Sequence, residues 1–122
     1  MDIRKEVQSI LDEVFYPLGV YSYWQHKPDD NSNEQYFVYS VVTTPSVEYA
    51  NDRILIRRYN VEILYYAKSD VFDYSLIERC QQAMFAHGYT LPVGEIDLGF
   101  LTDKDMRGIA MEFATERVVQ NG

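Results

Sequence analysis

Cysteine, histidine and long hydrophobic runs are scarce in this sequence. The single cysteine, Cys80, cannot form an intrachain disulfide, and the two histidines, His26 and His87, stand in no metal-ligand spacing. A reducing compartment is therefore expected. No stretch approaches the roughly 18 uncharged apolar residues of a membrane-spanning helix, and the charged, amphipathic start MDIRKEVQSI is unlike a signal peptide. We expect no membrane partner and no export by this route.

Motifs of common enzymes are also missing. The nucleotide-binding and hydrolase signatures GxGxxG, GxxxxGKS/T, GxSxG and HExxH do not occur. Cys80 falls on the apolar stripe of a predicted helix, where a thiol usually packs in the core, and His87 is expected to cap the end of that helix. Asp97, Asp103 and Asp105 match no calcium loop. The sequence therefore predicts no catalytic residue, no cofactor and no metal, and a protein that is not an enzyme.

Basic residues are outnumbered. The chain has 11 lysines and arginines against 19 aspartates and glutamates, a formal net charge of −8. Such a surface repels phosphate, so we expect no specific binding of DNA, although an acidic wall suits a channel through which DNA slides. Arg53, Arg57 and Arg58 form the one notable basic cluster. They are predicted to pair with a neighbouring subunit or to guard a solvated sheet edge.

Tyrosine, by contrast, is abundant, with 11 copies in 122 residues. Tyrosine is favoured both in strands and at protein interfaces, where its ring is apolar and its hydroxyl is polar. The proportions of hydrophobic residues (47%) and charged residues (25%) are typical of a globular protein of this length. Residues 1–122 are therefore predicted to form a single domain.

Two segments have the apolar spacing of amphipathic helices. The first is predicted over residues 2–16 with Asp2 as its capping residue, and the second over residues 71–87 with Ser69 and Asp70 as capping residues. The predicted apolar stripe of the second helix is Leu76, Ile77, Cys80, Met84 and Phe85.

Strand patterns fill most of the remaining sequence. Residues 36–43 carry apolar side chains on both faces, whereas residues 54–67 and 106–119 alternate between an apolar and a polar face. Residues 17–24 are read as a turn with a short extended piece, and residues 90–100 as a bent or edge strand. The predicted fold is α+β, an antiparallel twisted sheet with two helices packed on one face, in the order α-β-β-α-β-β.

These elements together resemble a known family, the small tail-terminator, tail-completion or head-tail joining proteins of long-tailed phages and prophages. The resemblance covers most of the chain. It rests on an amphipathic first helix that ends in PLGV, followed by YFVYSVVTTPSVEYANDR, YNVEILYYAKSD, LIERCQQAMFAHGY and MRGIAMEFATER.

The resemblance implies a structural subunit that assembles as a ring, commonly of six copies, on the end of the tail tube. Its expected partners are copies of itself, the tail-tube protein and the head-connector protein, while DNA passes through without specific binding. It also implies that the subunit assembles in the host cytoplasm and becomes part of the virion tail. Residues 1–122 would form a single tail-terminator-like domain.

The segment 44–53 is read as a hairpin arm and is the first candidate for a subunit contact. Tyr49 is predicted as an aromatic anchor and Arg53 as the partner of a neighbour's carboxylate. Two alternatives stay open: a non-phage binding module that dimerises through an exposed sheet edge, and an enzyme with a deep carboxylate pocket. The predicted interface residues are Val47, Tyr49, Asn51, Asp52, Arg53, Arg57 and Arg58.

Overall fold

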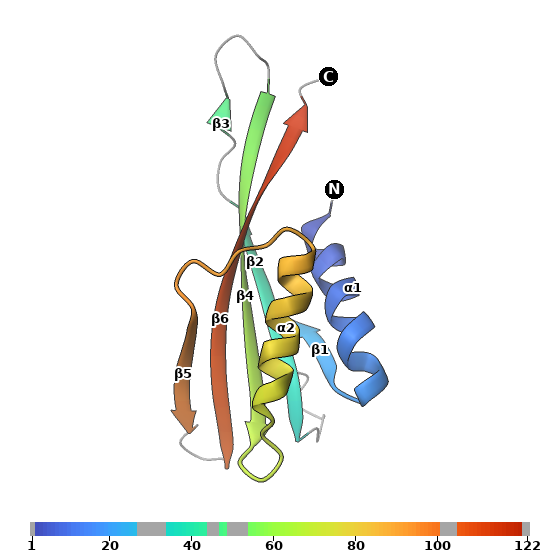
Figure 1. The fold of residues 1–122 in the computed structure, drawn as a ribbon, viewed down its shortest axis with the longest axis vertical. Coiled ribbons are helices and arrows are strands. Elements are labelled where there is room, and N and C mark those ends of the chain that lie inside the picture. Colours follow the sequence, from blue (N-terminus) through green and yellow to red (C-terminus); the bar gives the residue numbers. More distant parts are fainter. Residues whose placement is uncertain (1, 27–33, 44–46, 49–53, 101–104, 121–122) are drawn as a thin grey trace.

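Two helices and one mixed sheet make up the computed structural model, which describes residues 2–26, 34–43, 47–48, 54–100 and 105–120 (Figure 1). A short 3₁₀ turn, Tyr16–Leu18, follows the first helix. In chain order the elements are α1 (Ile3–Phe15), β1 (Tyr21–Trp24), β2 (Gln35–Thr43), β3 (Val47–Glu48), β4 (Ile54–Lys68), α2 (Tyr74–Ala86), β5 (Glu95–Phe100) and β6 (Met106–Gln120).

The sheet has the strand order β1-β2-β4-β6-β5, with the short β3 paired to β4. The predicted α+β class is confirmed, but the expectation of a fully antiparallel sheet is wrong, because β1 pairs with β2 in parallel. The predicted element order also lacked β1 and β3 as separate strands. A segment of four residues or fewer is too short for its alternation to reveal its pairing.

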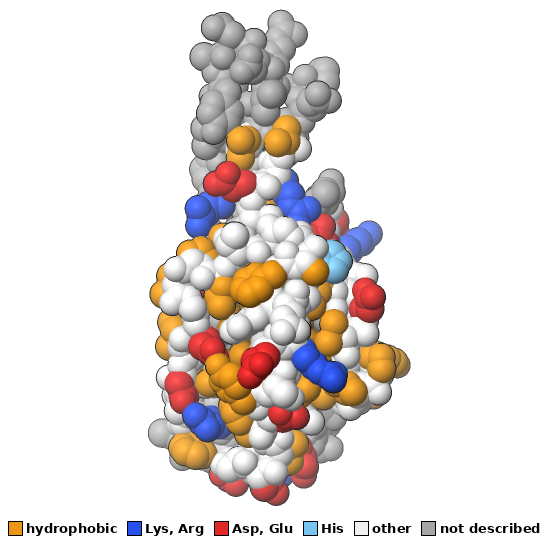
Figure 2. Space-filling model, viewed as in Figure 1, with side chains coloured by type: hydrophobic (Ala, Val, Ile, Leu, Met, Phe, Trp, Pro, Cys, Tyr) orange, Lys and Arg blue, Asp and Glu red, His pale blue; other side chains and the backbone are white. Residues whose placement is uncertain are grey.

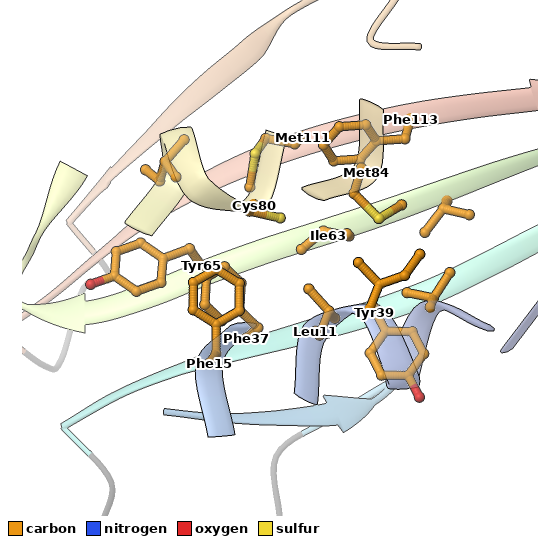
Figure 3. Packing of buried hydrophobic residues seen from close by; sticks show 14 of the residues in the cluster. Leu11, Phe15, Phe37, Tyr39, Ile63, Tyr65, Cys80, Met84, Met111 and Phe113 are labelled. Carbon is orange, nitrogen blue, oxygen red and sulfur yellow. The ribbon is translucent and has the colours of Figure 1, made fainter. Parts of the chain in front are cut away.

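The core lies between one face of the sheet and the two helices, as predicted (Figure 3). On the sheet side, Phe37 stacks on Phe15 of α1 with ring centroids 4.4 Å apart and lies 5.0 Å from the Tyr65 ring. On the α2 side, Cys80 and Met84 are fully buried against this face. Phe85, predicted on the apolar stripe of α2, is instead 47% exposed and contacts Phe113 with the edge of its ring.

The helix boundaries differ in how well the sequence predicted them. Helix α1 begins after Asp2, whose carboxylate accepts a hydrogen bond from the Lys5 backbone, as expected. Helix α2 begins only at Tyr74, because Asp73 is its capping residue and accepts hydrogen bonds from both Ser75 N (3.0 Å) and Ser75 Oγ (2.6 Å). The predicted caps Ser69 and Asp70 lie in the preceding turn.

Packing of the turn before α2 explains this difference. The backbone N–H groups of Val71 and Phe72 donate to the Lys68 carbonyl, which closes the turn. The Phe72 ring then packs 5.4 Å from the Tyr65 ring. Helical geometry therefore starts after Phe72, and the sequence alone does not show this contact.

Asp73 provides a test of the start of α2. The hydrogen bonds from Ser75 lower the pKa of the Asp73 carboxyl below its ordinary value of 3.8. Because the folded-state pKa is lowered, the stabilisation is complete above about pH 4 and is lost as the pH falls through the folded-state pKa. We expect the urea midpoint of the wild type to fall between about pH 4 and pH 2, and Asp73→Asn, which still caps the helix, to lose less. Equal acid losses in the two proteins would contradict this role.

Candidate subunit interface

The second face of the sheet is covered by neither helix in the described part of the chain (Figure 1). The helix-bearing side, by comparison, shows hydrophobic, acidic and basic side chains interspersed (Figure 2). We call the second face the open face. By strand register its central side chains are Tyr36, Val38, Ser40 and Val42 of β2, Arg58, Asn60, Glu62, Leu64 and Tyr66 of β4, and Gly108, Ala110 and Glu112 of β6.

Aromatic rings run across the open face from β1 toward β5. The ring centroids of Tyr23 and Tyr36 are 6.2 Å apart, and those of Tyr36 and Tyr66 are 5.5 Å apart. A Cβ atom at Gly108 would lie 2.8 Å from Cε1 of Tyr66 and 3.3 Å from Cδ1 of Leu98. The glycine therefore lets the Tyr66 ring lie close over β6, beside Leu98 of β5. We call Tyr23, Tyr36, Tyr66 and Leu98 the tyrosine row.

Two tyrosines of this row, Tyr36 and Tyr66, are held in the neutral form. Burial raises the pKa of Tyr36 and of Tyr66 above the ordinary value of 10.0, and the nearby Glu62 carboxylate adds to the rise at Tyr66. Their hydroxyls therefore remain protonated hydrogen-bond donors at neutral pH. A flat apolar surface with such donors is typical of a protein-protein contact.

Strand β5 forms one edge of the sheet and exposes large hydrophobic side chains. Ile96, Leu98 and Phe100 are each at least 44% exposed. A register shift between Asp97 and Gly99 bends the strand, and the Asp97 carboxylate accepts a hydrogen bond from Gly99 N. Bulges of this kind limit uncontrolled pairing at an edge.

Two carboxylates lie side by side in the middle of the open face. Glu62 of β4 and Glu112 of β6 are directly opposite one another in the register, and both are exposed. Together with Ser40, Val42 and Asn60 they line a shallow hollow of about 210 Å³. Like charges at directly opposed positions repel, so this pair destabilises the isolated sheet.

Beyond the core, β4 and β6 continue past the ends of the helices, and the short β3 pairs with β4 in this extension (Figure 1). We call residues 54–58 and 116–120 the ribbon. Arg117 fastens its base: the guanidinium lies 2.8 Å from Glu6 Oε1 and 3.1 Å from the His87 carbonyl, and over the Tyr89 ring.

Tyr89 completes this network by donating a hydrogen bond of 2.9 Å to Glu6 Oε1. Burial raises the pKa of the Tyr89 hydroxyl, and the hydrogen bond to Glu6 raises it further, so the hydroxyl remains a donor. The sequence analysis missed this network. Its members are separated by 83 and 111 positions in the chain, and no local pattern connects them.

The predicted interface residues are only partly placed. Val47 lies in β3 and pairs with Ile56 of the ribbon. Arg57 and Arg58 are consecutive in β4, so their side chains lie on opposite faces, and Arg58 donates to Asn60 Oδ1 on the open face (3.3 Å). The other predicted members, Tyr49, Asn51, Asp52 and Arg53, lie outside the described residues.

Residues weighed for chemistry have structural roles. Cys80 is fully buried, and burial raises the pKa of its thiol, as expected of a core cysteine. His87 Nδ1 lies 2.9 Å from the Ala83 carbonyl at the end of α2, the predicted capping position. Among the described residues, no group of three or more His, Cys, Asp or Glu side chains is arranged to hold a metal ion.

No family model matches the chain, and no curated protein matches it significantly. Within the described residues, no helix combines the length and apolar character needed to cross a membrane.

Proposed function

We propose that the protein is a structural subunit of a phage or prophage tail, which caps the tail tube, joins it to the head, or does both. The observation that carries the proposal is the open face with its tyrosine row, beside a ribbon that extends past the helices. A closed ring needs two different surfaces on each subunit that meet head to tail. The open face and the ribbon are two such surfaces.

The proposed partners are further copies of the chain, the tail-tube protein and the head-connector protein. The net charge of −8 suits a ring through which DNA passes without binding. The ring would form in the host cytoplasm and remain in the virion tail. A copy number of six is proposed from the resemblance described above.

Light scattering over a concentration series, with negative-stain imaging of the same sample, tests this function. We expect closed rings with a central hole, and binding of the protein to the ends of purified tail tubes. Tube-end binding with no ring in free solution would mean that the tube templates assembly. A protein that forms no ring and binds no tube end would contradict the proposal.

A second function is favoured by one observation, the exposed side chains of Ile96, Leu98 and Phe100 on the edge strand β5. Pairing of two β5 edges would join two copies into a closed dimer, as in a binding module unrelated to phages. The same scattering experiment separates the two functions. A dimer that forms no larger species at higher concentration, and that does not bind tail tubes, would favour the binding-module function.

A further inference from the structure

We propose that the ring contact forms when the ribbon of one copy lies across the acidic half of the next copy's open face, with Arg58 against the Glu62–Glu112 pair. This inference rests on the proposed ring and names the two surfaces that meet. The acidic half comprises Glu62, Glu112, Ser40, Val42 and Asn60, which surround the hollow between β2, β4 and β6.

The ribbon has exposed apolar surface that another subunit could bury. The described apolar core ends at Tyr59 on β4 and Phe113 on β6. Beyond it, polar contacts of Arg117 with Glu6 and with the His87 carbonyl connect the base of the ribbon to the helices. Val118, whose side chain belongs to the open-face side of the ribbon, is 66% exposed. An isolated two-stranded segment is only marginally stable in water, and in the described residues only the short β3, paired with Leu55 and Ile56, adds to the ribbon. Contact with another subunit would bury this apolar surface.

A cation would relieve the repulsion between the two carboxylates of the acidic half. Glu62 and Glu112 oppose one another across β4 and β6. In the described part of the chain, the ion pairs Lys68–Glu34, Arg107–Asp97 and Arg117–Glu6 include neither of them. A guanidinium can bind two carboxylates through its several N–H groups. Val42, which is 63% exposed, supplies apolar surface beside the pair for Val118 and Ile56 of the ribbon.

The two surfaces complement each other but cannot meet within one subunit. Arg58 and Glu62 share a face of β4 and are four residues apart, so their Cα atoms are separated by roughly 13 Å along the strand. The Arg58 side chain donates to Asn60, between them, and Arg58 lies opposite Glu116 of β6 in the register, so the same guanidinium also has a carboxylate of its own subunit nearby. A ribbon surface and a receiving surface on one strand can be satisfied by two different neighbours, as in a head-to-tail ring, or reciprocally by one partner, as in a two-fold dimer. The proposed ring corresponds to the first arrangement.

Charge exchange between two variants tests the contact. Arg58→Glu changes the ribbon, and Glu62→Lys/Glu112→Lys changes the receiving face. We expect each variant alone to self-associate at least about tenfold more weakly than the wild type, because like charges then meet. An equimolar mixture is expected to regain assembly, since every ribbon can then meet a face of opposite charge. The control is Glu78→Lys, an exposed position on α2 that is expected to assemble like the wild type.

Sedimentation velocity gives the readout, and circular dichroism checks that each variant folds. If a reversal variant does not fold, Arg58→Gln and Glu62→Gln/Glu112→Gln replace it, and each must still weaken assembly. Variants that assemble normally, or a mixture that stays dissociated, would contradict the proposed contact. If the wild type still formed rings, the proposed function would not be affected by that result. A wild type that remains monomeric up to about 1 mM would also overturn the contact. Binding to tail-tube ends would then decide the proposed function separately.

Discussion

Replacing Phe37 with alanine is expected to lower the free energy of unfolding by about 3–5 kcal/mol. Phe37 is fully buried, stacks on Phe15 and contacts Tyr65, so it joins α1 to the two strands β2 and β4. Removing the Phe37 ring reduces the buried apolar surface and leaves a cavity between α1, β2 and β4. These elements are held in place by the rest of the core, so they cannot move together to fill it. Since domains are stable by only about 5–15 kcal/mol, the variant is expected to be close to unfolding at room temperature.

Urea unfolding followed by circular dichroism measures this effect. Val42→Ala is the matched control, because Val42 lies on the same strand but on the open face and is 63% exposed. Its expected change is within about 0.5 kcal/mol. Similar losses in the two variants would mean that the helices do not pack on the face occupied by Phe37.

Replacing Arg117 with methionine is the second large change, with an expected loss of about 2 kcal/mol in the free energy of unfolding. The Arg117 and Glu6 side chains are only 22% and 21% exposed, so the substitution leaves a partly buried carboxylate without its cation. It also removes the hydrogen bond to the His87 carbonyl and the contact with the Tyr89 ring. We expect amide hydrogen exchange in the ribbon to accelerate more than exchange in the centre of β4.

Arg107→Met controls for the general effect of removing an arginine. Arg107 pairs with Asp97 at a similar distance, 2.7 Å, but these side chains are 39% and 50% exposed. Exposed pairs contribute roughly 0–1 kcal/mol, so a smaller loss is expected even though Arg107 also lies over Phe72. If Arg107→Met were the more damaging substitution, the Arg117 network would not fasten the ribbon.

Local patterns predicted most of the secondary structure. Helix α1 follows from apolar residues at helical spacing and a capping aspartate within the same segment. The alternation in β4 and β6 correctly assigned Ile63 and Met111 to the core face. The predicted start of α2 was wrong because several residues before Tyr74 can cap a helix, and the choice depends on the packing of Phe72 against Tyr65.

The candidate interface was less accessible to sequence analysis. Arg57 and Arg58 read as one basic cluster, yet a strand places consecutive side chains on opposite faces. The tyrosine row depends on the register that brings Tyr36, Tyr66 and Gly108 together from three strands. Abundant tyrosine was a signal that such a surface exists, but it did not indicate which residues form it.

The sequence by itself determined the two amphipathic helices, the core face of the long strands, the excess of negative charge and the burial of Cys80. These properties depend on neighbouring residues or on composition. Tertiary structure decided that β1 lies parallel to β2, that β5 forms an edge, that Glu62 opposes Glu112 and that Arg117 meets Glu6. Such contacts depend on which distant segments pair and in which register. Many alternative pairings would bury the same apolar faces, and only the packing of the whole chain selects one of them.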